Sequence, residues 1–332
     1  MNNKVKLSIL ESSVIDPWYN LALEENLFYE VEDDEVILYL WQNKKTVVIG
    51  RNQNPWRECR YKELEADGGK LARRLSGGGA VYHDLGNLNF TFIMKRKWFN
   101  IEKQLQVIID AVGNLGIKAQ FTGRNDIVVN GKKFSGNAFY YDGDRCYHHG
   151  TILVSANISK LSQYLKVSKE KIESKGIKSV SSRVINLEDV KPGLTVKELK
   201  ESLENSFKEV YKYNYSLKKE LLDDYKKDDL KTTYEKNASW NWRYGQTPNF
   251  KINLYKRFKF GDVEILINLK DSYISEIELY SDAMDSNLAI DIKKLLYAEK
   301  FTGSNMAEKI NILDKKYDTN IIFEIQEWLK VI

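Results

Sequence analysis

Residues able to hold a phosphate group gather in one segment of the chain, residues 73–84. There Arg73 and Arg74 precede three consecutive glycines at positions 77–79. Three glycines leave the backbone open to a ligand, and backbone N–H groups beside two guanidinium groups favour an anion. The segment lacks both the Walker A ending and the G-x-G-x-x-G spacing of a dinucleotide fold. We therefore predict a phosphate-binding loop of another architecture, with a tight turn flanked by surface arginines as the alternative.

Two adjacent lysines, Lys132 and Lys133, follow the turn dipeptide Asn130-Gly131 and so lie on the return strand of a hairpin. Adjacent side chains of a strand point to opposite faces, so only one lysine can enter a site on the sheet surface. Periodicity does not say which. The alternative is that both lysines are solvated residues beside a turn.

The chain has three histidines, His83, His148 and His149. His148 and His149 should point to opposite faces of their strand. We predict no tightly bound metal ion, because metal-ligating residue types at usable spacing are missing.

The composition bears on which molecules the protein can bind and on the compartment in which it resides. A total of 51 Lys and Arg against 47 Asp and Glu gives a net charge of +4, too weak for a committed nucleic-acid binder. Two cysteines, Cys59 and Cys146, cannot build a disulfide framework and are normal in a reducing compartment. No apolar run approaches the length of a membrane span. We expect a cytoplasmic protein with neither nucleic-acid nor membrane partners.

The elements that must position these residues follow from local signals. Asp16 as N-cap and Pro17 at the first helical position predict a helix through Phe28. A second helix should end near the glycines at 68–69. Further patterns predict strands at 36–41, 46–50, 87–94 and 147–154, a helix at 101–115, and a hairpin over 126–134.

A length of 332 residues suggests one large and one small unit. The pattern resets near Lys251 after a cluster of aromatic residues at 240–245, which should pack back onto the first unit. Beyond it we predict strands at 258–260, 263–269 and 274–280 and helices at 288–297 and 321–329. We therefore expect a catalytic domain over 1–247 and a small α+β domain over 251–332 that acts as a mobile cover.

In these motifs the chain resembles bacterial lipoate-protein ligases of the two-domain type, in the biotin/lipoate protein ligase superfamily. The resemblance covers nearly the whole length. It rests on Asp16-Pro17-Trp18-Tyr19-Asn20-Leu21-Ala22, residues 49–56, residues 73–87, Gly123-Arg124-Asn125-Asp126, Lys133-Phe134-Ser135-Gly136, His148-His149-Gly150-Thr151, residues 175–184 and residues 240–250.

The resemblance implies an α+β fold. Its core is a mixed, mainly antiparallel sheet with flanking helices, similar to biotin protein ligases and class II aminoacyl-tRNA synthetases. It also implies a two-step reaction in which lipoate and ATP, with Mg²⁺, give lipoyl-AMP. The lipoyl group then passes to a lysine of an apo lipoyl domain, in a 2-oxoacid dehydrogenase E2 or the glycine-cleavage H protein.

The resemblance also implies roles for particular residues. The motif Lys-x-Ser-Gly makes Lys133 the catalytic lysine, which bridges the lipoate carboxyl oxygen and the α-phosphate. Asp126 would orient Lys133 or help hold Mg²⁺, and a loop at 175–183 would order around the adenylate. ATP would be held by Arg74, Gly79, Ala80, Val81, Tyr82 and Lys133, and lipoate by Lys133, Gly78, Gly50 and His149, with Arg51 beside the lipoyl tail. A structural, hydrogen-bonded role is the alternative for His149.

Two alternatives remain open at this point. A lipoyl or octanoyl transferase of the same fold would carry the acyl group as a thioester on Cys146, which lies beside Arg145 and near His148. The residues beyond 251 favour the ligase, because such transferases resemble the first domain alone. A non-enzymatic binding module would keep the glycine loop but would not need Lys133.

Overall fold

The computed structural model describes residues 5–122, 126–166, 183–211, 217–222, 228–244 and 252–332. Its contacts divide the chain into two compact units. The first comprises residues 1–49, 55–74 and 80–243, and the second comprises residues 50–54, 75–79 and 244–332. The second unit therefore contains two short loops from the N-terminal half of the chain besides the C-terminal residues.

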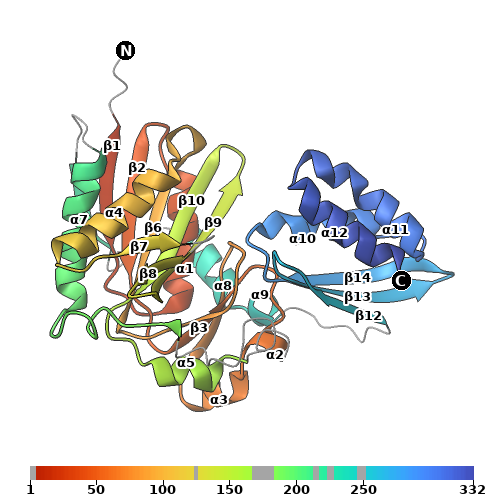
Figure 1. Ribbon diagram of the computed structural model, residues 1–332, viewed down its shortest axis with the longest axis horizontal. Coiled ribbons are helices and arrows are strands. Elements are labelled where there is room, and N and C mark those ends of the chain that lie inside the picture. The colour runs from red at the N-terminus through yellow and green to blue at the C-terminus, as the bar shows by residue number, and fades with distance from the viewer. Residues whose placement is uncertain (1–4, 123–125, 167–182, 212–216, 223–227, 245–251) are drawn as a thin grey trace. The chain divides into compact units, whose positions relative to one another are not determined.

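An eight-stranded sheet forms the centre of the first unit (Figure 1). Its order is β11 (Leu217–Leu221), β1 (Lys6–Glu11), β2 (Glu35–Trp41), β6 (Asn87–Lys95), β10 (Arg145–Leu153), β9 (Lys132–Asp142), β8 (Asp126–Val129) and β7 (Gln120–Thr122). β1 is parallel to both β11 and β2, and the other neighbours are antiparallel. The expected mixed, mainly antiparallel sheet is confirmed, although β1, β7 and β11 were not predicted.

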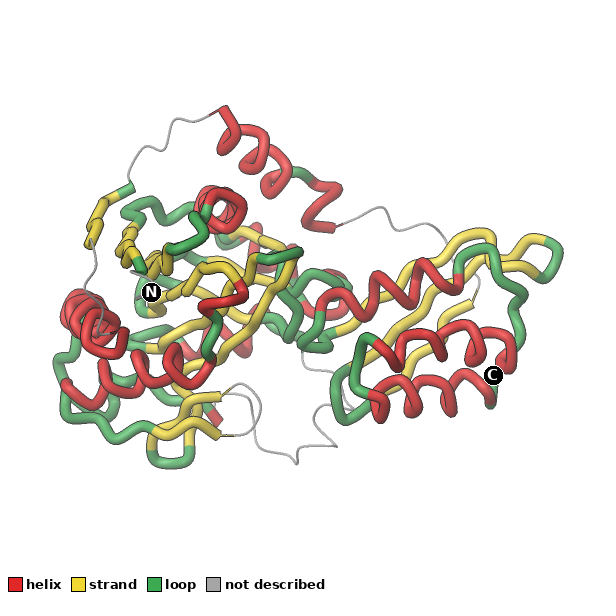
Figure 2. The backbone as a smooth tube through the Cα atoms, turned by 90° about the horizontal axis from the view of Figure 1, so that it is seen from above, coloured by secondary structure: helices red, strands yellow, loops and turns green. Residues whose placement is uncertain are grey.

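Helices lie on both sides of this sheet (Figure 2). Helices α4 (Ile101–Asn114) and α7 (Val196–Tyr211) pack together over one face, and α1 (Pro17–Glu30) and α8 (Asp228–Ala238) over the other. Alternate residues of each strand point to the face under α4 and α7, and most of these residues are apolar. These include Leu7, Ile9, Val36, Leu38, Leu88, Phe90, Phe92, Met94, Cys146 and Ile152. None of the described helices is long and apolar enough to cross a membrane.

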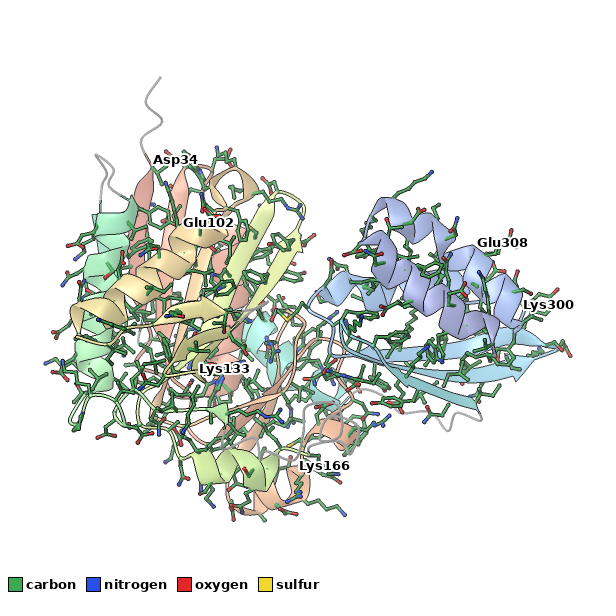
Figure 3. All side chains as sticks on the ribbon, viewed as in Figure 1. Asp34, Glu102, Lys133, Lys166, Lys300 and Glu308 are labelled. Atoms are coloured by element: carbon green, nitrogen blue, oxygen red, sulfur yellow. The ribbon has the colours of Figure 1, made fainter. Side chains whose placement is uncertain are left out.

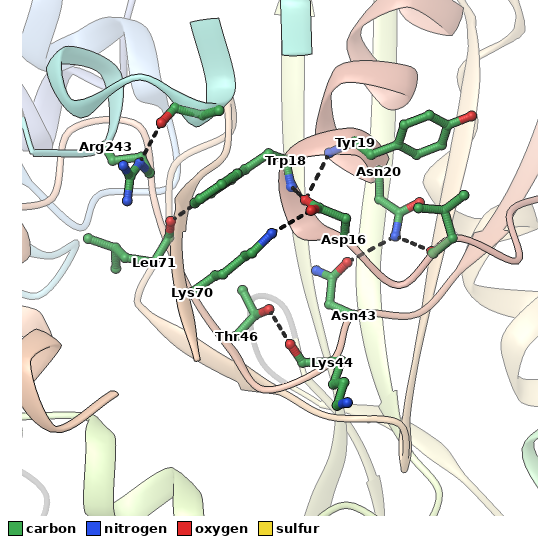
Figure 4. Close-up of polar contacts among 12 residues, drawn as sticks. Asp16, Trp18, Tyr19, Asn20, Asn43, Lys44, Thr46, Lys70, Leu71 and Arg243 are labelled. Atoms are coloured by element: carbon green, nitrogen blue, oxygen red, sulfur yellow. Dashed lines mark hydrogen bonds and ion pairs between the residues drawn. The ribbon is translucent and has the colours of Figure 1, made fainter. Parts of the chain in front are cut away.

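Helix α1 begins where its sequence signals place it. The Asp16 carboxylate accepts a hydrogen bond from the Trp18 backbone N–H at 2.9 Å and forms an ion pair with Lys70 (Figure 4). The Trp18 indole N–H donates to the Leu71 carbonyl at 3.0 Å. The ion pair with Lys70 and the hydrogen bond to Leu71 tie the start of α1 to β4 (Lys70–Arg73), the strand that leads into the glycine loop.

A smaller three-stranded sheet flanks the glycine loop. Its central strand β3 (Thr46–Ile49) is parallel to β4 and antiparallel to β5 (Val81–His83). Two short helices, α2 (Pro55–Glu58) and α3 (Tyr61–Ala66), connect β3 to β4, and α5 (Ile158–Tyr164) lies near β5 and α3. The predicted helix end near residues 68–69 is confirmed, with φ at Gly68 of +72°.

The C-terminal part of the second unit is an antiparallel sheet of β12 (Ile252–Arg257), β13 (Asp262–Lys270) and β14 (Tyr273–Ser281). Helices α10 (Ser286–Leu296), α11 (Gly303–Ile310) and α12 (Thr319–Lys330) share its core. The strand predicted at 258–260 is wrong. Phe258 instead turns back to Gly261 through a 2.9 Å backbone hydrogen bond, and its ring packs against Trp328. Phe258 is apolar because its side chain packs in the core, although its backbone belongs to no strand.

Three further short helices are α9 (Trp240–Tyr244), η1 (Arg96–Trp98) and η3 (Asn311–Lys315). The aromatic cluster at 240–245 was expected to pack onto the first unit, and its described part does so. The Trp242 indole N–H donates to the Arg73 carbonyl at 2.9 Å.

One histidine belongs to the core of the first unit. His148 is fully buried against the ring of Phe139, with its Nδ1 3.0 Å from Gln104 Oε1 and its Nε2 2.8 Å from Asn137 Oδ1. Burial, reinforced by His149, lowers the pKa of His148 to about 3. The neutral ring carries one N–H, so one of the two amides must turn its NH₂ group toward the ring.

This burial makes the fold sensitive to acid. The unfolded chain protonates His148 near the ordinary histidine pKa of 6.5 and the folded chain only near 3, so stability falls as pH drops between these values. The loss should reach about 2 kcal/mol by pH 5, since one pKa unit is worth about 1.4 kcal/mol. Urea unfolding of the wild type and His148→Gln at pH 7 and pH 5 checks this. An unchanged pH slope in the variant would contradict the assignment, whatever its absolute stability.

Candidate functional site

The Lys133 side chain lies on the sheet face that carries Gly136 and Thr151. Figure 3 labels this side chain on the first unit. Its ammonium Nζ lies 2.6 Å from Asp126 Oδ1 on the neighbouring strand, and both side chains are about one-third exposed. Lys132 is exposed at the start of β9. The Lys133 carbonyl accepts from the Ile185 backbone N–H at 3.0 Å. The backbone of Lys133 is therefore held on both sides while its ammonium stays accessible.

A β-bulge puts Lys133 on that face. The pairing of β8 with β9 joins Ile127 to Ser135 but Val128 to Lys133, so β9 carries one extra residue, Phe134. In a regular strand, positions 133 and 136 would point to opposite faces. The bulge turns both to the same face and sends Phe134 into the core, where it is fully buried.

Gly136 provides the space in which the lysine lies. A Cβ atom at Gly136 would stand 2.8 Å from both Cε and Nζ of Lys133, and 3.9 Å from Thr151 Oγ1. Any side chain at position 136 would therefore displace the ammonium. The Lys-x-Ser-Gly motif thus has a local meaning: the lysine, the bulge and the missing side chain act together.

The two arginines before the glycine loop have different surroundings. Arg73 donates from Nε to the Trp242 carbonyl and from Nη2 to the Arg243 carbonyl, each at 2.8 Å. Arg74 is buried, and its Nη1 lies 3.3 Å from the Val48 carbonyl. Burial lowers the pKa of Arg74 to about 10, opposed by the charges of Tyr147 and Glu24. The guanidinium remains charged at neutral pH.

The glycine loop is less open than its sequence suggests. Within the second unit, a Cβ at Gly77 would lie 2.2 Å from the Ala283 carbonyl oxygen, and the Gly78 N–H donates to that oxygen at 3.1 Å. Gly50 packs on the same loop, since its Cβ would lie 2.3 Å from the Gly78 oxygen. Gly79 is exposed, and a Cβ there would meet open space. In this conformation Gly77 and Gly78 contact Ala283 whereas Gly79 faces open space, and ligand contact by Gly78 stays a prediction.

The predicted nucleotide-binding residues after the loop lie at the edge of the small sheet. Ala80 and Val81 are half-buried, and Tyr82 is buried with its ring against Tyr164. Gly123, Arg124 and Asn125 lie outside the described residues. So do most of the loop at 175–183 and residues 245–250.

His149 lies on the face opposite His148, as strand alternation predicted. Its Nδ1 is 2.9 Å from Glu24 Oε1, and its ring lies 4.7 Å from that of Tyr147. Sequence reasoning missed Glu24, which is 2% exposed. The signal was present, because position 24 falls on the buried stripe of α1 with Leu21, Leu27 and Phe28.

Cys146 lies on the core side of β10 with His148, away from this face. Its thiol Sγ is 3.6 Å from the Met94 carbonyl oxygen, and burial raises its pKa to about 12 against the opposing charge of Arg96. Both ring nitrogens of His148 face amides, so no base reaches the thiol from that residue. The geometry argues against a thioester on Cys146.

Cys146 should therefore resist alkylation in the folded protein. Iodoacetamide reacts with the thiolate, so at pH 8 labelling should be about a thousandfold slower than in the urea-unfolded chain. Peptide mass spectrometry after timed labelling measures this, and Cys59 serves as an internal control because burial also raises its pKa to about 12. Rapid labelling of Cys146 alone in the native protein would revive the thioester route.

Comparison with known proteins agrees with this geometry. A family model described as lipoyl protein ligase A/B catalytic domain matches residues 16–208, and one described as bacterial lipoate protein ligase C-terminus matches residues 247–329. A lipoate-protein ligase A from Psychrobacter cryohalolentis is 40% identical over 333 residues, which cover 98% of each chain.

Two solved structures share the fold. The structure of P. falciparum LipL1 in complex with lipoate has a TM-score of 0.86 and 31% identity over 98% of this chain and 100% of that one. A bipartite lipoate protein ligase from Thermoplasma acidophilum, studied with its E2 lipoyl domain, has a TM-score of 0.62 and 25% identity over 75% and 99%. The chain therefore belongs to the lipoate-protein ligase A family, with both its catalytic and its C-terminal parts.

Proposed function

We propose that this chain is an ATP-dependent lipoate-protein ligase. In the first step a lipoate carboxylate oxygen bonds to the α-phosphorus of ATP and pyrophosphate leaves. In the second step a lysine amine of the acceptor bonds to the acyl carbon, AMP leaves, and the amine loses a proton. Membership of the family and the position of Lys133 beside Asp126 and Gly136 support this reaction.

The observation that carries the proposal is the position of the Lys133 ammonium. The first step requires two anions, a carboxylate and a phosphate, to approach each other. A fixed positive charge between them offsets their repulsion and the charge that develops on phosphorus. Asp126 holds Lys133 at 2.6 Å, and Gly136 leaves the space in which it lies. A lysine so constrained loses little side-chain entropy when the substrates bind.

Arg74 and the segment 79–82 are the proposed nucleotide contacts, and Gly50, Gly78 and His149 the proposed lipoate contacts beside Lys133. Arg74 is buried and charged, so it can bind phosphate strongly in a site of low dielectric. Mg²⁺ would arrive with ATP, which usually supplies much of its coordination. Among the described residues no group of three metal-ligating side chains occurs, and we assign Asp126 to orienting Lys133.

The proposed acceptor is an apo lipoyl domain, of a 2-oxoacid dehydrogenase E2 or of the glycine-cleavage H protein. The Thermoplasma acidophilum relative was studied with its own E2 lipoyl domain, which supports the first of these. Both cysteines are free, in keeping with a reducing compartment such as the cytoplasm. We further propose residues 1–247 as the catalytic domain and residues 251–332 as an accessory domain.

Lys133→Ala should abolish both half-reactions while Lys132→Ala stays active. Loss of the fixed charge should cost about 10²–10³-fold in kcat, with little change in thermal stability because the side chain is partly exposed. Pyrophosphate release and the mass of an apo lipoyl domain, each measured with ATP and lipoate, report the two steps separately. A dead Lys132→Ala with an active Lys133→Ala would contradict the assignment. Full lipoylation without ATP would contradict the proposed function itself.

Gly136→Ala should act on chemistry rather than on folding. The added methyl would stand 2.8 Å from Lys133 Cε and Nζ, and the flexible lysine would give way at small cost to stability. We expect kcat to fall at least about tenfold with the melting temperature nearly unchanged. Gly113→Ala in α4 is the matched control, since its Cβ would meet open space. Equal activity of the two variants would show that the space over Gly136 is not needed.

A further inference from the structure

Two tryptophan side chains cover the outer edge of β4. This strand lies at one end of the small sheet, and among the described strands it pairs with β3 alone. On its other edge the Trp18 indole N–H donates to the Leu71 carbonyl at 3.0 Å (Figure 4). The Trp242 indole N–H donates to the Arg73 carbonyl at 2.9 Å. Carbonyls two residues apart leave a strand on the same side, so the two indoles take the place of a neighbouring strand.

The peptide group between Arg73 and Arg74 is fixed from both sides. Its carbonyl oxygen, on Arg73, accepts from Trp242. Its N–H, on Arg74, donates to the Ile49 carbonyl of β3 at 3.0 Å. A peptide group is planar, so hydrogen bonds on its two opposite sides leave it little freedom to rotate. The Trp242 indole therefore helps to set the direction in which the Arg74 side chain leaves the backbone.

Arg73 fixes Trp242 in return. Its guanidinium donates from Nε to the Trp242 carbonyl and from Nη2 to the Arg243 carbonyl, each at 2.8 Å. These carbonyls belong to the last turn of α9, where the helix itself cannot use them as acceptors. The planar fork of an arginine reaches two carbonyls at once, which a lysine ammonium on its flexible stem does not reproduce. The Lys236 ammonium lies 4.8 Å from the centre of the Trp242 ring and adds a cation–π contact.

We propose that Trp242 is a positioning residue for Arg74, and that Arg73 holds Trp242 in place rather than binding an anion. This inference rests on the proposed ligase function, in which Arg74 contacts the nucleotide. A guanidinium that is already held in its binding geometry loses less conformational freedom when the nucleotide arrives. Loss of the reciprocal contact between Arg73 and Trp242 should therefore weaken the binding of ATP and leave that of lipoate unchanged.

The first test removes one indole N–H at a time. Trp242→Phe keeps an aromatic ring but takes the donor from the Arg73 carbonyl, so it should raise the KM for ATP about tenfold and that for lipoate less than twofold. Trp18→Phe is the matched control. It takes the same kind of donor from Leu71 on the same edge of β4, but outside the peptide group that leads into Arg74. Both variants should lose similar thermal stability, and Trp18→Phe should keep the wild-type KM for both substrates.

Arg73→Lys separates the two roles that this arginine could have. Lysine keeps the positive charge but not the fork, so it should raise the KM for ATP about as much as Trp242→Phe does. The double variant should be within about twofold of either single variant, because both changes break the same reciprocal contact. Near-wild-type kinetics in Arg73→Lys would show that the charge alone matters and would contradict the proposal. Effects that multiply in the double variant would contradict it as well.

Hydrogen exchange of the Arg74 amide gives a second readout, which needs no activity. Its bond to Ile49 should open more often once the carbonyl of the same peptide group is released, so exchange should be about tenfold faster in Trp242→Phe and unchanged in Trp18→Phe. Unchanged exchange in Trp242→Phe would overturn the proposal. If Trp242→Phe did not fold, unchanged exchange and an unchanged ATP KM in Arg73→Lys would overturn it. Faster exchange in Trp242→Phe, with no pyrophosphate release by the wild type, would support the positioning of Arg74 and count against the proposed function alone.

Discussion

The alternation of side chains along the central sheet is the constraint on which the site depends. Along β10, Cys146, His148 and Ile152 face the apolar core under α4 and α7, whereas Tyr147 and His149 contact α1 on the other side. Alternation thus separates two adjacent histidines into different environments. One is a neutral core residue with a pKa of about 3, and the other is a buried polar group that contacts Glu24 of α1. The same alternation buries the Cys146 thiol on the core side, where its pKa is raised to about 12.

A single irregularity in that alternation sets the position of Lys133. The bulge at Phe134 shifts the parity of β9, so that Lys133 and Gly136 share a face although they are three residues apart. Asp126 stands on the neighbouring strand, where pairing with Gly136 fixes its position. The position of the Lys133 side chain thus follows from backbone pairing and from the absence of a side chain at Gly136. The flexible lysine itself contributes little to its own placement.

Strong local signals were enough to predict much of the fold. The Asp16 cap, the Asn130-Gly131 turn and the apolar periodicity of residues 101–115 indicated elements that the structure contains. Strand pairing between segments far apart in the sequence could not be predicted. β1 and β11 are parallel neighbours more than 200 residues apart, and no local pattern encodes that. The sequence also favoured ligand contact for Gly77 and Gly78, and no local pattern indicated that both would contact Ala283. Three consecutive glycines suit both ligand contact and close backbone packing, so the sequence alone does not distinguish the two.

Electrostatics explain how the first unit tolerates a buried carboxylate. Thr91 and His149 contact Glu24 Oε1 at 2.6 and 2.9 Å, and the Glu24 charge raises the pKa of the buried Arg74 against the larger effect of desolvation. Buried opposite charges therefore lower each other's cost. Lys133, by contrast, is about one-third exposed and paired with a carboxylate of similar exposure. The interior charges are fixed by burial, whereas the Lys133 side chain stays partly open to solvent, as its proposed role in binding two anions requires.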